Sequence, residues 1–346
     1  MTRRMRGRPA GPRSLTRRKL LATGAALGAG AALGSVAPAA ARARTAAEPG
    51  RTVFRLPDGF RPGCVGDGRF NLLYFGSLHD GSVHRIDPAT GEGAPVHRGT
   101  GGPAVALQVN WQTSLFIAGG ASGELRVIEG GTGAVRGIYP LGGAGAYASD
   151  LIGLGAGHYV TDAARPSVHL LPYGPFGSLP PPPGGIVTLP LTGEWVQGDG
   201  PTATGITYAD DGGLIILNSA AGALYRVDPK TGNAVRIPHH GPSLCGADGL
   251  RTLGGRLYVV RPERNAVDVL RLDPATGSTT VGRLTDPGLD VPGKPAVDWS
   301  RTQLCVPNTR RGTPPTPTTP YTALSLPVGD QNGPGPSPGG GTMPAS

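Results

Sequence analysis

Short stretches in which apolar and polar residues alternate recur along the chain. Strict alternation is the signature of a strand with one buried face. The clearest copies occupy residues 81–91, 222–232 and 266–277, a weaker copy occupies 123–133, and two eroded copies occupy 167–172 and 322–327. The three clear copies contain Asp-Pro-x-Thr-Gly, in which proline presets φ and glycine accepts a positive φ. Each copy therefore predicts a strand that leads into a hairpin turn.

The spacing of the copies indicates how the strands are grouped. Where no insertion intervenes, successive copies start 42 to 44 residues apart, as from Gly81 to Gly123 and from Gly222 to Ala266. A second apolar run precedes the marked strand, for example at residues 72–75, 115–118, 214–217 and 257–260. Such runs suit strands that are covered on both faces. A period of about 40–45 residues with four strands per unit is typical of a β-propeller.

Six units result, and they predict an all-β, six-bladed β-propeller. Residues 52–56 precede the first unit, and we expect them to pair beside the last strand, residues 321–326, and to close the ring. Closure removes exposed sheet edges, which would otherwise invite aggregation. Residues 172–185, with four consecutive prolines from Pro180, predict an irregular loop, because proline cannot donate to a sheet ladder.

Composition agrees with this fold and narrows the class of partner. The chain of 346 residues has 59 Gly, 37 Pro and only 16% charged residues, which disfavours long helices. Its formal charge of +9 arises in residues 1–43, which hold eight Arg, one Lys and no acid, so the remainder has 23 basic and 23 acidic residues. A neutral domain lacks the surplus positive charge that phosphate backbones require. We therefore expect no nucleic-acid partner.

The first 43 residues predict an export signal. Arg17 and Arg18 lie in Ser-Leu-Thr-Arg-Arg-Lys-Leu-Leu, an Ala/Gly/Leu stretch follows, and Ala41-Arg42-Ala43 offers a cleavage site. This order matches a twin-arginine signal, whereas an uncleaved membrane anchor is the alternative. We expect an extracellular monomer without a membrane partner after removal of the signal. Residues 44–50 would be a linker, 51–328 the propeller, and 329–346 a disordered Gly/Pro-rich tail.

The cysteines and histidines show no metal-ligand spacing. Cys64, Cys245 and Cys305 are too few and too scattered for a disulfide scaffold, so we expect buried small side chains. A bridge between Cys64 and Cys245 remains open. The pair His239-His240 precedes the fifth inner strand, and exposed loop histidines are the preferred interpretation. Phosphate-binding loops and nucleophile elbows are absent from the sequence.

Five segments carry a resemblance to a known family. They are Leu-Pro-Asp-Gly-Phe-Arg-Pro at 56–62, Tyr-Phe-Gly-Ser at 74–77, Leu-Pro-Leu-Thr-Gly-Glu-Trp-Val-Gln at 189–197, Leu-Thr-Asp-Pro at 284–287 and the Thr/Pro-rich run at 313–323. Through them the chain, from about residue 51 to 327, resembles the senescence marker protein (regucalcin)/gluconolactonase-like propellers. It is most similar to a secreted actinobacterial branch of that family. The resemblance implies sugar-lactone hydrolysis at an axial divalent-metal site, often calcium.

The family's ligands are a Glu, an Asn and an Asp on inner strands, with a further Asn-Asp pair in the third blade. The inner-strand segments here are residues 61–65, 103–107, 147–151, 202–206, 244–250 and 290–296. Gly63 stands where Glu is implied, Thr204 where Asn is implied, and Ser149 replaces the Asn of the pair. Asp150 and Asp248 match the family. Because calcium affinity depends on ligand number and charge, the sequence predicts a degenerate site.

The resemblance thus assigns a metal-ligand or catalytic role to Asp248, a catalytic role to Asp150, and substrate contacts to Ser149 and Thr204. Calcium would bind weakly or not at all. Two functions follow as hypotheses. One is a secreted lactone hydrolase, and the other is a non-catalytic propeller that binds a small molecule, a glycan or a protein.

Overall fold

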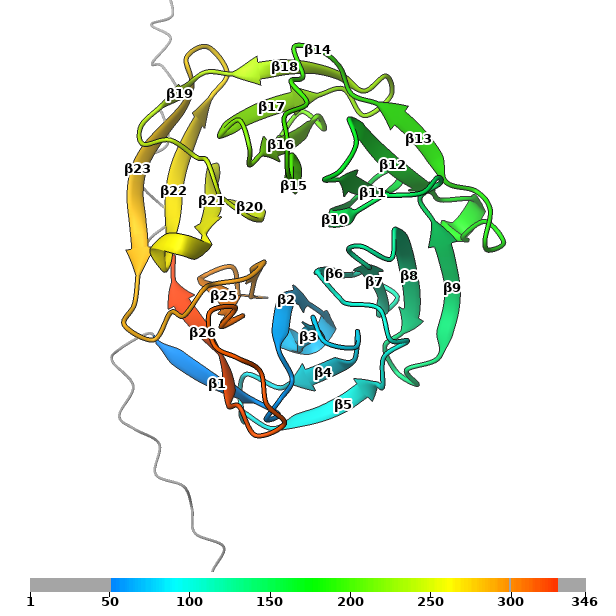
Figure 1. Cartoon of the computed structure of the whole chain (residues 1–346), viewed down its shortest axis with the longest axis vertical. Coiled ribbons are helices and arrows are strands. Elements are labelled where there is room, and N and C mark those ends of the chain that lie inside the picture. The colour runs from blue at the N-terminus through cyan, green and yellow to red at the C-terminus, as the bar shows by residue number, and fades with distance from the viewer. Residues whose placement is uncertain (1–50, 299, 329–346) are drawn as a thin grey trace, which may run out of the picture. The chain divides into compact units, whose positions relative to one another are not determined.

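The computed structural model describes residues 51–298 and 300–328, all of them within one compact unit. Six sheets are arranged around a common axis (Figure 1), each with four antiparallel strands. The predicted six-bladed β-propeller is confirmed. The predicted signal, linker and tail, residues 1–43, 44–50 and 329–346, lie outside the described residues. Within the described ranges, no helix is long and apolar enough to cross a membrane.

The strands follow the same order in each blade, from the axis to the rim. The innermost strands are β2 (Pro62–Asp67), β6 (Ala106–Val109), β10 (Ala148–Leu154), β15 (Ala203–Tyr208), β20 (Leu250–Leu253) and β24 (Ala296–Val297). The second strands are β3 (Leu73–Ser77), β7 (Ser114–Ala118), β11 (Gly157–Asp162), β16 (Leu214–Asn218), β21 (Arg256–Arg261) and β25 (Gln303–Pro307). The third strands are β4 (Val83–Ile86), β8 (Glu124–Glu129), β12 (Ser167–Pro172), β17 (Ala223–Val227), β22 (Ala266–Asp273) and β26 (Tyr321–Pro327). The outer strands are β5 (Gly93–His97), β9 (Val135–Pro140), β13 (Val187–Pro190), β18 (Asn233–Ile237), β23 (Gly277–Thr285) and β1 (Thr52–Leu56).

The Asp-Pro-x-Thr-Gly segments form the predicted turns between third and outer strands. In the first blade Asp87 Oδ1 accepts the N–H of Ala89 at 2.9 Å. Gly91 has a φ of +75° and donates its N–H to the Asp87 carbonyl at 2.7 Å. Asp228 and Gly232 repeat the same backbone hydrogen bond in the fourth blade. An aspartate that bonds the backbone two residues on, followed by a left-handed glycine, explains why this sequence recurs.

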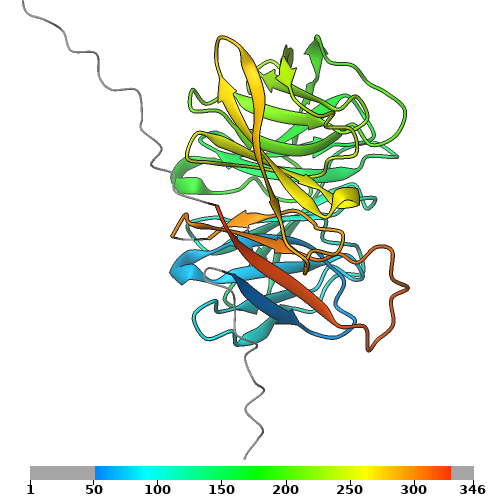
Figure 2. The same cartoon turned by 90° about the vertical axis from the view of Figure 1, so that its left-hand side faces the viewer.

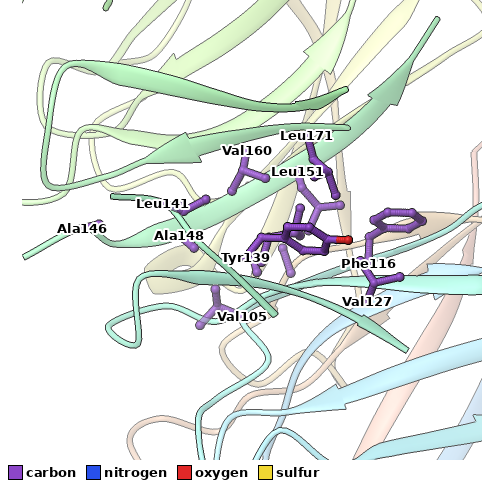
Figure 3. Packing of buried hydrophobic residues seen from close by; sticks show 13 residues of the cluster. Val105, Phe116, Val127, Tyr139, Leu141, Ala146, Ala148, Leu151, Val160 and Leu171 are labelled. Carbon is purple, nitrogen blue, oxygen red and sulfur yellow. The ribbon is translucent and has the colours of Figure 1, made fainter. Parts of the chain in front are cut away.

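Each pair of neighbouring sheets shares one hydrophobic cluster, which gives six clusters around the ring. Figure 3 shows the cluster between the second and third sheets, where Phe116 and Val127 face Leu151 and Val160. The Tyr139 ring is also part of this cluster, and its hydroxyl donates to the Pro180 carbonyl at 2.9 Å. Burying one such side chain contributes about 1.5–3 kcal/mol, so the sheets are held mainly by face-to-face packing.

The ring closes as the sequence predicts, by pairing of the first strand with the last. β1 runs antiparallel to β26, with Thr52 opposite Ser325 and Leu56 opposite Tyr321, and the two strands lie side by side in Figure 2. Phe54 and Leu56 are buried between the first and sixth blades, whereas Val53 faces outward. Residues far apart in the chain therefore complete the sixth blade.

Two short strands on the rim were not predicted. β14 (Thr192–Gly193) adds in parallel to β18, and β19 (His239–His240) adds in parallel to β23. The irregular loop after β12 contains a single 3-10 turn, η2 (Pro175–Gly177); the others are η1 (Arg69–Asn71) and η3 (Pro262–Arg264). The histidine pair thus lies on the outer edge of the fifth blade (Figure 1), away from the axis.

Candidate functional site

Three inner strands are irregular near their starts, at the positions that the resemblance assigns to ligands. The strand pairing shifts between Pro62 and Cys64, between Ala148 and Leu151, and between Ala203 and Gly205. Bulges of this kind redirect side chains and occur beside functional sites. They place Gly63, Ser149, Asp150 and Thr204 in irregular backbone at one end of the axis.

A cavity of about 710 Å³ opens at that end of the axis. It is lined by Leu78, Pro103, Val105, Tyr147, Ser149, Ala163, Ala164, Gly200, Pro201, Thr204, Ser219, Gly246, Ala247, Asp248, Pro262, Glu263, Lys294 and Arg311. All of these residues come from the starts of inner strands, from the segments that lead into those strands, or from the loops between second and third strands, and every blade contributes. The volume falls in the range of small-molecule sites.

Lys294 places an ammonium group among oxygen atoms at the cavity wall. Its Nζ forms an ion pair with Asp248 Oδ1 and donates to the Thr204 carbonyl at 2.5 Å. The Lys294 side chain is 4% exposed and that of Asp248 is 19% exposed. Arg311 lies on the other side of the carboxylate, with Nη2 3.6 Å from Asp248 Oδ2. The carboxylate thus lies between two positive charges.

The backbone of Lys294 is fixed at the seam between the sixth and first blades. Its N–H donates to the Gly63 carbonyl at 3.0 Å, and its own carbonyl accepts the N–H of Val65 at 3.1 Å. Gly249, with a φ of +82°, packs against the aliphatic part of the Lys294 side chain. A Cβ added at Gly249 would lie 3.2 Å from Lys294 Cγ. The side chain therefore reaches from this seam to the fourth and fifth blades.

These residues do not fit the divalent-metal site that the resemblance implies. Asp248 and the Thr204 carbonyl, which could be metal ligands, are engaged by the ammonium. Two unit charges 4 Å apart repel by about 4 kcal/mol at an effective dielectric near 20, and a divalent ion would double this. Gly63 cannot be exchanged for Glu without movement, because an added Cβ would lie 2.9 Å from the Ala104 carbonyl oxygen. Within the described ranges, no cluster of three or more His, Cys, Asp or Glu could hold a metal.

The two predicted substrate contacts both line the cavity. Ser149 is 4% exposed and Thr204 is 6% exposed. The Thr204 hydroxyl donates to the Ala247 carbonyl at 3.2 Å, which ties the fourth inner strand to the segment that carries Asp248. Together with Ser219 and Tyr147 they form a hydroxyl-rich wall.

Asp150 lies beside this site but does not line the cavity. It is fully buried, and its Oδ1 and Oδ2 accept the N–H groups of Leu151 at 2.9 Å and Ile206 at 3.1 Å. Burial raises the pKa of Asp150, while the positive charges of Lys294 and Arg251 partly offset this effect. In this structure Asp150 joins the third and fourth inner strands.

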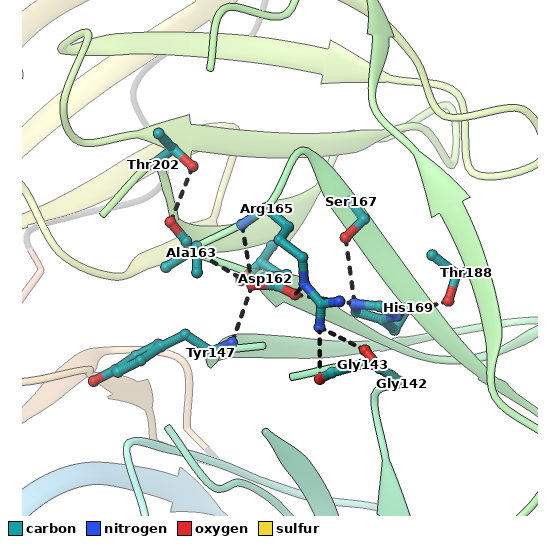
Figure 4. Close-up of polar contacts among 12 residues, drawn as sticks. Gly142, Gly143, Tyr147, Asp162, Ala163, Arg165, Ser167, His169, Thr188 and Thr202 are labelled. Carbon is teal, nitrogen blue, oxygen red and sulfur yellow. Dashed lines mark hydrogen bonds and ion pairs between the residues drawn. The ribbon is translucent and has the colours of Figure 1, made fainter. Parts of the chain in front are cut away.

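Asp162, which the sequence analysis did not single out, holds one wall of the cavity in place (Figure 4). Its Oδ1 accepts the N–H groups of Tyr147 and Ala164, both at 3.0 Å, and its Oδ2 accepts Nε of Arg165 at 2.9 Å. Burial opposes ionisation, but the hydrogen bonds from His169 and from these backbone groups outweigh it and lower the pKa of Asp162. Because Tyr147 and Ala164 line the cavity, Asp162 is a positioning residue.

The cysteine predictions are confirmed in part. Cys64 and Cys305 are buried, and burial raises the pKa of the Cys64 thiol to about 12. Cys245 is exposed, so its predicted core position is wrong: it lies in a loop before the fifth inner strand rather than in a regular strand. All three thiols are free, and the bridge between Cys64 and Cys245 is not formed.

Sequence reasoning also missed Lys294 and Arg311. Lys294 lies in the sixth inner-strand segment that was predicted to approach the axis, and it is one of only three lysines against 29 arginines. A rare lysine in a segment that otherwise holds Asp290 and only Val, Pro, Gly and Ala was the available signal. Arg311 lies in the loop between β25 and β26, for which local sequence gives no indication of direction.

The fold and cavity define a six-bladed β-propeller with a ligand-sized cavity at one end of its axis. No family model matches the chain, and no curated protein is matched by its sequence. Among solved structures, it is similar to regucalcin, a calcium-binding protein from Agrobacterium tumefaciens, with 15% identity over 79% of this chain and 92% of that chain and a TM-score of 0.56.

Two further solved structures extend the range of functions with this fold. A catalytically inactive virginiamycin B lyase from Staphylococcus aureus with quinupristin has 12% identity over 80% of this chain and 99% of that chain, with a TM-score of 0.56. A provisionally assigned 6-phosphogluconolactonase from Bacteroides fragilis has 15% identity over 71% and 76%, with a TM-score of 0.52. At these identities the likeness is one of fold, which does not define chemistry.

Proposed function

We propose that this protein is an extracytoplasmic binding propeller whose axial cavity takes a polyhydroxylated small molecule without a divalent cation. The observation that carries the proposal is the cavity lining. Its walls combine the hydroxyls of Ser149, Thr204 and Ser219 with the charge pair of Asp248 and Lys294.

The chemistry of these walls suits a neutral, oxygen-rich ligand. Hydroxyl groups both donate and accept hydrogen bonds, and proline and leucine side chains at the same cavity offer apolar contact. The two acidic and two basic residues of the lining, Asp248, Glu263, Lys294 and Arg311, balance in formal charge. A strongly charged ligand would therefore find no net attraction, whereas a sugar or a sugar-derived compound would find partners for its hydroxyls.

The proposal is tested by thermal shift and calorimetry with a panel of monosaccharides, sugar acids and sugar lactones, each with and without EDTA. A ligand that binds only the folded state raises its stability by about 2.7 kcal/mol at a hundredfold excess over Kd. We expect at least one probe to bind equally well in EDTA. Ser219→Trp fills the cavity and is expected to abolish binding. Ala89→Trp, in a turn at the other end of the propeller, is the matched control, and binding that survives Ser219→Trp would refute the proposal.

Lactone hydrolysis is the second candidate function. It is favoured by the presence of Asp248 at the cavity and by the fold likeness to a provisionally assigned 6-phosphogluconolactonase. Its test is turnover of glucono-1,5-lactone by the purified protein, measured by proton release against buffer alone. Turnover that requires Asp248 would replace the binding proposal, whereas binding without turnover would exclude this candidate for that lactone.

A further inference from the structure

The positive charge beside Asp248 at the axial cavity comes from a side chain of the protein, Lys294. We propose that the Lys294 ammonium occupies a latent divalent-cation site formed by Asp248 and the Thr204 carbonyl, and that removing the ammonium exposes a weak calcium site. The inference concerns the charge at the axis and holds whichever small molecule the cavity takes.

The ligands of the ammonium are those of a hard cation. Asp248 supplies a carboxylate oxygen and Thr204 a backbone carbonyl oxygen, and calcium binds both types of oxygen. Ser149 lines the same cavity, and the cavity has room for water molecules as further ligands. An ammonium is a compact point charge, unlike the planar guanidinium of arginine. Lysine is therefore the side chain that best takes the place of a bound ion.

The backbone of Lys294 is held in place, which restricts the positions that its ammonium group can reach. Both backbone groups of Lys294 are hydrogen-bonded to the first inner strand, through Gly63 and Val65. The stem runs beside Gly249, where no side chain could be accommodated without adjustment. A tethered ion of this kind stays at the axis under conditions that strip a bound metal.

The ion pairs of Asp268 lie within a single blade and differ in this respect from the pair of Lys294 and Asp248. Asp268 is fully buried and pairs with Arg261 at 2.8 Å and Arg283 at 2.6 Å. Those three residues lie on adjacent strands of the fifth blade and use arginine, as most positive positions of this chain do. The pair of Lys294 and Asp248 instead joins different blades and borders the cavity. A cation bound at a ligand site would occupy a position of this kind.

The decisive experiment compares the response of melting temperature to calcium in wild type and in Lys294→Ala, at constant ionic strength. Calcium sites with few charged ligands have Kd values of about 0.1–1 mM. In about 10 mM calcium such a site raises the melting temperature by about 3 °C. We expect this shift in Lys294→Ala and none in wild type. Lys294→Gln, which removes the charge and leaves a somewhat shorter polar side chain, is the second variant if the alanine variant does not fold.

Two further variants separate a vacated site from a general loss of positive charge. Arg311→Ala also removes a positive charge beside Asp248 but leaves the ammonium, so it should remain insensitive to calcium. The double variant Lys294→Ala with Asp248→Asn should lose the response. A saturable calcium shift in wild type, an equal shift in Arg311→Ala, or no shift in folded Lys294→Ala or Lys294→Gln would each overturn the inference. None of these outcomes depends on the ligand proposed for the cavity.

Discussion

Lys294 and Asp248 are unequal partners, because the ammonium is almost buried while the carboxylate is partly open to the cavity. Removing one member of a buried pair leaves the other charge uncompensated, and the remaining charge carries most of the cost. Thr204 offers Lys294 only a neutral carbonyl oxygen as its other acceptor. The stability of the axis therefore depends on Asp248 even before any ligand binds.

We predict that Asp248→Asn lowers the free energy of unfolding by about 3 kcal/mol, as expected for a broken buried pair. The measurement is urea denaturation with wild type in parallel. Asp290→Asn is the matched control, because Asp290 pairs with Arg310 in a far more exposed setting, where such pairs contribute about 1 kcal/mol or less. Equal losses in the two variants would contradict the prediction.

His158 is a buried histidine in the third blade that the sequence did not distinguish from the exposed ones. Its ring stacks on Phe116, and its Nδ1 lies 2.8 Å from the Tyr173 hydroxyl. Burial lowers the pKa of His158 to about 3, whereas the unfolded chain has an ordinary value near 6.5. The neutral ring is thus required by the fold.

We predict that His158 makes the protein less stable as the pH falls from about 6.5 to about 3. In this window the unfolded chain takes up a proton that the folded chain cannot, so stability decreases by up to about 1.4 kcal/mol per pH unit. His158→Phe should show a shallower loss of stability than wild type when both are denatured with urea across this window. His240→Phe, at an exposed position on the rim, should follow the wild-type curve. Parallel curves for wild type and His158→Phe would disprove this role.

Among the elements, β1 is the short strand that closes the ring by pairing with β26. Its five residues complete the sixth blade and place Phe54 and Leu56 between that blade and the first. Without it, β26 would present an unpaired edge, which is an aggregation hazard. The strand therefore contributes both packing and closure.

We predict that Phe54→Ala lowers the free energy of unfolding by about 3–5 kcal/mol, the range for a buried Phe replaced by Ala. Val53 is the matched control, because it lies on the same strand but is 47% exposed, and Val53→Ala should change stability by no more than about 0.5 kcal/mol. Chemical denaturation of the two variants checks the difference. A similar small effect in both would show that β1 does not hold the ring.

At the scale of the whole molecule, the chain carries no excess of charge once residues 1–43 are set aside, because residues 44–346 have 23 basic and 23 acidic residues. The predicted twin-arginine leader lies outside the described residues, and export remains a prediction of the sequence. We expect that Arg17→Lys with Arg18→Lys retains the protein in the cytoplasm, because this export route reads the arginine pair. Cell fractionation measures the result, and Arg13→Lys is the control outside the pair. Unchanged export of the double variant would exclude the route.

Local pattern determined the blades, because alternation, turn residues and a period near 42 residues are properties of short stretches of chain. The family resemblance, which rests on short segments of sequence, drew attention to Gly63, Ser149, Thr204 and Asp248, and these positions lie on inner strands or directly before them. Only the tertiary structure brought Lys294 to Asp248 and Thr204, which are 46 and 90 residues away in the chain. These contacts of Lys294 depend on ring closure, strand register and three bulges. No local pattern of residues encodes their combined geometry.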